Sequence, residues 1–196
     1  MPNGCKFHII SFGSSFKYLK QQEPFDYNDA NLRYCKDEID KFSADFGGTE
    51  IFEPLQSVFE NGSDAKRRIF LLTDGDVFSQ EKLIKLIENN CQSDGMNKVF
   101  TFGIGGDLSR ELVIDSAMAG KGDFSFVADT NLGTLRAKVI GMLQKATEPV
   151  LADCSFTFLP NWPSSDSGLF RPARKQELGQ IFRNSLVCQF TVMSEE

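Results

Sequence analysis

The chain has 196 residues, of which 41% are hydrophobic and 24% charged, and its formal net charge is −6. This composition is typical of a globular protein and argues against a disordered one. The longest basic cluster is Lys66-Arg67-Arg68, which is too short for a nucleic-acid-binding stripe, so we expect no nucleic-acid partner. No apolar run has the length of a membrane span, so we expect no membrane partner either.

The first half of the chain predicts strands and helices in alternation. Residues 7–12 (FHIISF) predict a short apolar strand, and a Gly-Ser-Ser turn follows. Apolar residues at helical spacing predict one helix that ends at Gly47-Gly48 and a shorter second helix. Their apolar positions are Leu32, Cys35, Ile39, Phe42 and Phe46, then Ile51, Leu55, Val58 and Phe59. The continuous run 69–73 (IFLLT) predicts a central strand covered on both faces.

The alternation continues to about residue 148. Ser79 and Ser109 are each placed to cap a helix, and residues 99–104 (VFTFGI) and 124–127 predict strands. The apolar positions of the three helices are Leu83, Ile84 and Ile87, then Leu112, Val113 and Ala117, then Leu132, Leu135, Val139, Met142 and Leu143. This order predicts an α/β, Rossmann-like domain at 1–150, with a mostly parallel sheet and helices on both faces.

The pattern changes after residue 150. Residues 155–158 and 188–192 alternate as half-exposed strands do, and a turn-rich loop at 160–168 lies between them. About forty residues cannot form an independent β domain. Residues 151–196 are therefore predicted to be the start of a C-terminal β-rich region.

The five cysteines are scattered and odd in number, which favours free thiols in a reducing compartment. No signal peptide is visible, so we expect a cytoplasmic protein. The alternative is a secreted parent protein, in which the sequon Asn61-Gly62-Ser63 would be relevant. The spacing of the cysteines and the single histidine, His8, fit no zinc site.

Oxygen-bearing side chains gather where predicted strands end or helices begin, the region where α/β sheets bind ligands. The three segments are Gly47-Gly48-Thr49-Glu50, Thr73-Asp74-Gly75-Asp76 and Gly103-Ile104-Gly105-Gly106-Asp107. Carboxylates and hydroxyls without His or Cys suit Mg²⁺ or Ca²⁺. Each segment alone also has an ordinary explanation as a turn or a helix cap.

Two other classes of site are weaker. The glycines of the third segment do not have the spacing of a dinucleotide-binding turn. The candidate nucleophiles Ser14, Ser15 and Thr49 could pair only with His8, which lies in an apolar strand context. We therefore expect no catalytic residues.

The segments FHIISFGSSF, FGGTEIFEPL, RRIFLLTDGDV, KVFTFGIGGDLSRELV and AMAGKGDFSFV resemble, in this order, the von Willebrand factor type A domain. The subtype they are most similar to occurs in inter-alpha-trypsin inhibitor heavy chains, their intracellular relatives and the vault poly(ADP-ribose) polymerase. The resemblance spans about residues 4–148. IFRNSLVCQFTVMSEE is similar to the β region that follows the domain there.

The resemblance implies a metal-ion-dependent adhesion site, where three loops hold one Mg²⁺ and a carboxylate of a protein partner completes its shell. Thr49 matches the second-loop threonine and Asp74 the third-loop aspartate, with Glu50 and Asp76 as binding-loop neighbours. The first-loop motif Asp-x-Ser-x-Ser is missing, because Ser11-Phe12-Gly13-Ser14-Ser15 has serines but no aspartate. We therefore expect no cofactor for this chain alone and Mg²⁺ only in a complete parent domain.

By the same resemblance, the first strand, the first loop and the first helix are missing. The chain is then a truncated gene model or fragment, or else a real short product that folds poorly or pairs with another chain; we favour the first. The expected function is a non-enzymatic protein-interaction module that contacts its partner through the strand-end loops. The alternative is a scaffold fragment of a larger enzyme of the vault poly(ADP-ribose) polymerase type.

Overall fold

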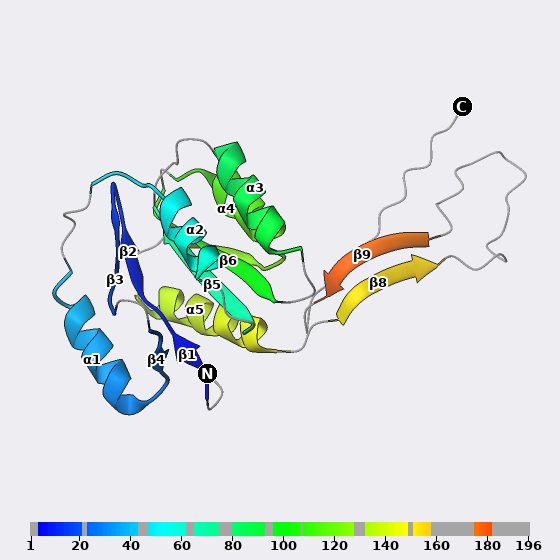
Figure 1. The fold of residues 1–196 in the computed structure, drawn as a ribbon. Coiled ribbons are helices and arrows are strands. Elements are labelled where there is room, and N and C mark those ends of the chain that lie inside the picture. The colour runs from blue at the N-terminus through cyan, green and yellow to red at the C-terminus, as the bar shows by residue number, and fades with distance from the viewer. Residues whose placement is uncertain are drawn as a thin grey trace, which may run out of the picture. The chain divides into compact units, whose positions relative to one another are not determined.

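The structure is a computed structural model and describes residues 4–20, 23–42, 47–61, 65–74, 80–92, 96–106, 108–127, 132–148, 151–157 and 175–181. The chain divides into two compact units, Met1–Thr147 and Glu148–Glu196. In the larger unit short strands come first, and helices and strands then alternate (Figure 1). No helix in the described ranges has both the length and the apolar character to cross a membrane.

Seven strands and five helices make up the described part of the larger unit. The strands are β1 (Lys6–Phe7), β2 (Ile10–Phe12), β3 (Phe16–Tyr18), β4 (Phe25–Asp26), β5 (Arg67–Thr73), β6 (Asn97–Ile104) and β7 (Phe124–Val127). The helices are α1 (Asp29–Ile39), α2 (Phe52–Glu60), α3 (Gln80–Asn90), α4 (Arg110–Ala119) and α5 (Leu132–Thr147).

Strands β5, β6 and β7 form a parallel sheet with β6 in the middle. Ile69 pairs with Val99, and Thr101 pairs with Phe124. Helices α2, α3 and α4 lie on one side of this sheet and α5 on the other (Figure 1). The structure confirms the predicted α/β fold with a parallel sheet and helices on both faces.

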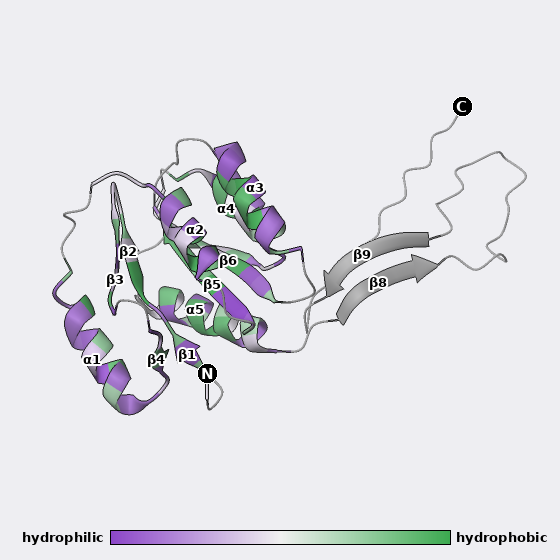
Figure 2. Ribbon diagram, viewed as in Figure 1, coloured by the Kyte–Doolittle hydropathy of each residue, from purple (hydrophilic) through white to green (hydrophobic). Residues whose placement is uncertain are grey.

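The main core lies between the sheet and the layer of α2, α3 and α4. Each of these helices contributes buried apolar side chains, which meet those of β5 and β6. The cluster contains Ile51, Leu55, Phe59, Leu71, Leu83, Ile87, Cys91, Val99 and Leu112. Hydrophobic and hydrophilic residues lie on different parts of the α3 surface, as Figure 2 shows. The spacing of the apolar residues thus explains the layer, since one stripe of each helix is buried.

The opposite face of β5 is covered less completely. The Arg68 guanidinium donates from Nε to the carbonyl of Ala146 on α5 at 3.0 Å, and the Phe70 ring stacks on the Phe100 ring with centroids 5.3 Å apart. Leu72 on β5, however, is 46% exposed, and Ile140 on α5 is 45% exposed. Burial on this face therefore falls toward the carboxyl end of β5.

Two short antiparallel ladders precede the parallel sheet: β1 pairs with β4, and β2 pairs with β3. The β2–β3 ladder is tied to α2, because the Tyr18 hydroxyl and the Ser57 hydroxyl lie 2.9 Å apart. Phe12 of β2 also packs against the main core. Within the described ranges β2 and β5 are not hydrogen-bonded neighbours, although both lie against the same core.

Several predicted boundaries were wrong. The strand predicted at 7–12 is divided into β1 and β2, and the first helix ends at Ile39 rather than at the glycine pair. The polar stretch after β2 contains β3 and β4, which were not predicted. Strand β5, expected in the centre of a sheet, lies at the edge of its three-stranded ladder, and β6 is the central strand. Among the described strands, β6 is the one hydrogen-bonded neighbour of β5.

The smaller unit contains an antiparallel pair, β8 (Leu151–Thr157) and β9 (Lys175–Ile181). Strand β8 overlaps the strand predicted at 155–158. The strand predicted at 188–192 and the predicted loop at 160–168 lie outside the described residues. Strand β9 was not predicted, because Gly179 and Gln180 interrupt the alternation of apolar and polar residues in this segment.

Candidate functional site

The segment before α2 depends on two glycines in the left-handed region, Gly47 at φ 53° and Gly48 at φ 46°. A side chain would be strained at either φ. At Gly48 there is also no room, because an added Cβ would lie 2.6 Å from the Ser14 hydroxyl oxygen. This close approach brings the Gly-Ser-Ser turn after β2 to the segment that carries Thr49.

A backbone hydrogen bond holds the two segments together. The Glu50 N–H donates to the carbonyl of Gly13 at 2.8 Å. Thr49 is half-buried and Glu50 is exposed. Ile51, the next residue, is fully buried in the main core. The Thr49 segment is therefore fixed on one side by the core and on the other by the turn after β2.

Asp74 is exposed and directly follows β5. Leu71, three residues before it, belongs to the same buried cluster as Ile51, and Phe12 of β2 packs against that cluster. Ser14, Thr49 and Asp74 each lie within three residues of one of these apolar side chains. The structure thus holds the Ser14 turn against the Thr49 segment, and Asp74 follows a strand that packs in the same core. Asp76 lies outside the described residues.

The third predicted segment follows β6. Gly105 has a φ of 98° and Gly106 is exposed, while Asp107 lies outside the described residues. Ser109 caps α4 as predicted, since its hydroxyl accepts from the Leu112 N–H at 3.2 Å. The next residue, Arg110, lies with its guanidinium carbon 4.1 Å from the centre of the Phe126 ring. This contact places a cation at the carboxyl end of β7.

The protein ligands brought together here do not by themselves fit Mg²⁺. That ion needs six oxygens in octahedral array and releases its waters reluctantly. The described segments offer the Thr49 hydroxyl, the Asp74 carboxylate and the neighbouring Ser14 hydroxyl. Within the described ranges, no three His, Cys, Asp or Glu side chains group closely enough to hold a metal ion.

His8 lies between β1 and β2 and is exposed. Its ring meets the Tyr18 ring edge-on at 5.5 Å. Partial burial lowers the pKa of His8, and the positive charges of Arg67 and Lys20 add to this effect. The contact with Tyr18 is a packing interaction between two rings.

In the sequence, Ser14 was a weak nucleophile candidate and part of a serine-containing segment that lacks the aspartate of the first-loop motif. The structure gives it a different place, beside Gly48 and next to Thr49. The sequence signal for this contact is slight: a serine in a glycine turn after one strand, and a glycine pair before a helix. The contact joins residues 34 positions apart, and no local pattern predicts such a pairing.

The chain belongs to the von Willebrand factor type A domain family, because the family model matches residues 1–126. A von Willebrand factor A domain-containing protein of Dictyostelium discoideum is 30% identical over 186 residues, covering 93% of this chain and 19% of that protein. The mouse von Willebrand factor A domain-containing protein 5B1 is 33% identical over 180 residues, covering 91% of this chain and 14% of that protein. The chain thus spans less than a fifth of these relatives.

Solved structures have the same fold. A von Willebrand factor type A protein from Catenulispora acidiphila superposes with a TM-score of 0.65 at 18% identity, over 79% of this chain and 36% of that one. Proximal thread matrix protein 1 from the mussel byssus, with a zinc-occupied adhesion-site motif, gives a TM-score of 0.53 at 22% identity, over 78% of this chain and 39% of that one. At these identities the likeness shows the fold alone.

Proposed function

We propose that this domain is a non-enzymatic protein-interaction module that contacts a protein partner through the loops carrying Ser14, Thr49 and Asp74. The observation that carries the proposal is the contact of the Ser14 turn with the Thr49 segment, which is anchored in the same core as β5, the strand that Asp74 follows. Family membership supports it, since domains of this family typically mediate protein–protein interaction. An exposed carboxylate beside hydroxyl groups suits recognition of a cation or a polar partner more than covalent chemistry.

The proposal includes an incomplete metal site. Thr49 and Asp74 supply one hydroxyl and one carboxylate, and Glu50 and Asp76 are neighbours rather than ligands. In a domain that also carries an Asp-x-Ser-x-Ser loop, that loop would supply the remaining ligands. In a domain completed in this way, Mg²⁺ would bridge the loops to a carboxylate of the partner.

The arrangement around α2 supports such a preceding strand. The end of α2 is bonded to both sheets, because the Asn61 side-chain amide donates to the Tyr18 hydroxyl at 3.3 Å and the Arg67 guanidinium donates to the Asn61 carbonyl at 2.6 Å. Strands β2 and β5 therefore lie under one helix without a ladder between them in the described ranges. A parallel strand inserted between them would join the two sheets.

Calorimetric titration with Mg²⁺ tests this function. We expect negligible binding by the 196-residue chain at millimolar Mg²⁺, because two or three protein ligands compete poorly with water. The same chain extended upstream by a strand and an Asp-x-Ser-x-Ser loop should bind Mg²⁺. In the extended chain Asp74→Ala should abolish binding, and the matched control Glu50→Ala should retain it.

Two results would contradict the metal-site proposal. Tight binding by the short chain would mean that Ser14, Ser15 or Asp107 completes the shell. Failure of the extended chain to bind, with its helical circular dichroism intact, would remove Mg²⁺ from the function.

A scaffold role within a larger enzyme of the vault poly(ADP-ribose) polymerase type is the second candidate. The observation that favours it is the short span of this chain, which covers 19% and 14% of two relatives. Extending the reading frame in both directions separates the candidates, because a catalytic domain in the same gene would support the scaffold.

A further inference from the structure

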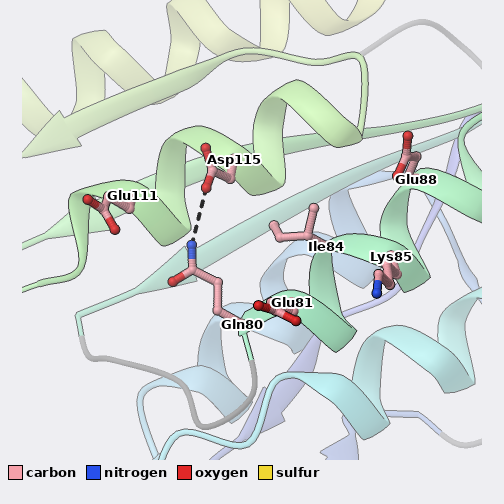
Figure 3. A pocket seen from close by; sticks show the side chains of 7 residues that line it. All are labelled: Gln80, Glu81, Ile84, Lys85, Glu88, Glu111 and Asp115. Atoms are coloured by element: carbon pink, nitrogen blue, oxygen red, sulfur yellow. Dashed lines mark hydrogen bonds between the residues drawn. The ribbon is translucent and has the colours of Figure 1, made fainter.

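A groove of about 550 Å³ lies between α3 and α4, on the helical layer rather than on the loops of the proposed metal site. Figure 3 shows side chains of both helices around it. The lining residues are Gln80, Glu81, Ile84, Lys85, Glu88, Glu111 and Asp115. The volume is within the range typical of ligand-binding clefts in proteins.

Helical geometry produces this surface. On α3 the lining residues follow the spacing of one helix face, and on α4 the two lining residues lie one turn apart. Beneath them α3 and α4 are held together by fully buried side chains, among them Leu83, Ile87 and Leu112. At one end the Gln80 side-chain amide donates to the Asp115 carboxylate at 3.3 Å. The walls of the groove are therefore fixed by the core.

The groove is strongly acidic. Four carboxylates, those of Glu81, Glu88, Glu111 and Asp115, face a single ammonium, that of Lys85. In the part of the chain that the structure describes, none of the four carboxylates has a cationic group within 4.0 Å. The local charge of −3 is thus available to a ligand, and it attracts positively charged groups.

Ile84 is an apolar side chain among the charged side chains that line the groove. It is half-buried on the groove side of α3. A small apolar centre surrounded by charged groups is the usual composition of a protein-docking site, where the apolar contact supplies affinity and the rim supplies specificity. A metal ion would gain nothing from Ile84, whereas a peptide side chain would bury it.

We propose that the α3–α4 groove binds a basic segment of a partner protein. One apolar side chain of that segment packs on Ile84, and flanking Lys or Arg side chains meet Glu81, Glu88, Glu111 and Asp115. Charge complementarity selects this occupant, because an acidic or uncharged segment would leave the carboxylates unpaired or repelled. The groove is a second interaction surface, and it does not require Mg²⁺.

Fluorescence anisotropy with the full chain tests the proposal. The probe is a labelled peptide, Lys-Leu-Lys-Arg-Leu-Lys-Arg, at physiological salt. Glu111→Lys with Asp115→Lys should weaken binding at least about tenfold, because both substitutions place like charges against the peptide. The matched control is Asp37→Lys with Glu53→Lys, which makes the same change in net charge at exposed positions on α1 and α2. It should leave the affinity within about twofold.

A third variant, Ile84→Ser, tests the apolar contact and should weaken binding about tenfold while leaving the charges intact. Circular dichroism establishes that each variant is folded. Equal weakening by both double variants would mean attraction to the net charge alone and would overturn the proposal. Unchanged binding by Glu111→Lys with Asp115→Lys, or by Ile84→Ser, would also overturn the proposal. Because no variant touches Ser14, Thr49 or Asp74, failure here is separate from failure of the metal site.

Discussion

Lys98 is a charged side chain that the structure buries almost completely. It lies on β6, is 2% exposed and pairs in register with Arg68 of β5. Burial lowers the pKa of Lys98 to about 8, and the positive charges of Arg68 and Lys121 contribute to the shift. This burial was not predicted, because Lys98 precedes the predicted strand and lysines at strand ends are ordinarily exposed.

The lowered pKa predicts that stability rises with pH above about 8. Between this value and the ordinary lysine pKa of 10.5, the folded state has released the proton while the unfolded state keeps it. Lys98 should therefore contribute an increase in the free energy of unfolding from pH 8 to pH 10.5, which Cys91 opposes above pH 9 because burial raises its pKa to about 11. In Lys98→Met this increase should be smaller. Urea unfolding across that pH range measures it, with Lys36→Met as the exposed control; parallel curves for all three chains would contradict the prediction.

At the scale of elements, the segment between α4 and β7 is packed tightly against the start of β6. The Val99 N–H donates to the Gly120 carbonyl at 3.0 Å, and the Gly122 N–H donates to the Ala117 carbonyl at 3.0 Å. A Cβ added at Gly122 would lie 2.0 Å from the Val99 carbonyl oxygen. The obstacle is backbone, so no side-chain rotation can relieve the overlap.

Gly122→Ala should therefore destabilise the domain by about 1–3 kcal/mol, the usual cost of overpacking. Gly141→Ala is the matched control, since it lies inside α5 and its added Cβ would meet nothing within 4 Å. That substitution should stabilise by up to about 1 kcal/mol through helix propensity. Chemical denaturation of both variants gives the two changes in free energy. A neutral Gly122→Ala would show that the segment can shift away from β6.

The predictability of each element follows from the range of the interactions that form it. Strands β5, β6 and β7 and helices α2 to α5 were predicted, and α1 with a different end, because their apolar periodicity and caps are local signals. The three-residue strand β3 and the two-residue strand β4 were missed, since so few residues show no alternation, although β3 pairs with the adjacent strand β2. Thr49 and Asp74 came from resemblance to the family. The contact of Ser14 with the Thr49 segment needed the structure.

For the whole molecule, the cysteines bear on the compartment in which the chain folds. The structure describes Cys5, Cys35 and Cys91 as free, with Cys35 and Cys91 buried. Burial raises the pKa of Cys91 to about 11, which keeps it in the unreactive thiol form. We expect thiol titration of the denatured, unreduced protein to find close to all five cysteines of the sequence. Two stable disulfides would instead favour the secreted alternative.

Among the described strands, β2 and β5 each have a hydrogen-bonded neighbour on one side only. Leu72 of β5 is 46% exposed, so the open edge of β5 lies next to an exposed apolar side chain. Open strand edges with apolar side chains are templates for pairing with other polypeptides. Copies of this chain should therefore tend to associate through this region, and association should rise with protein concentration.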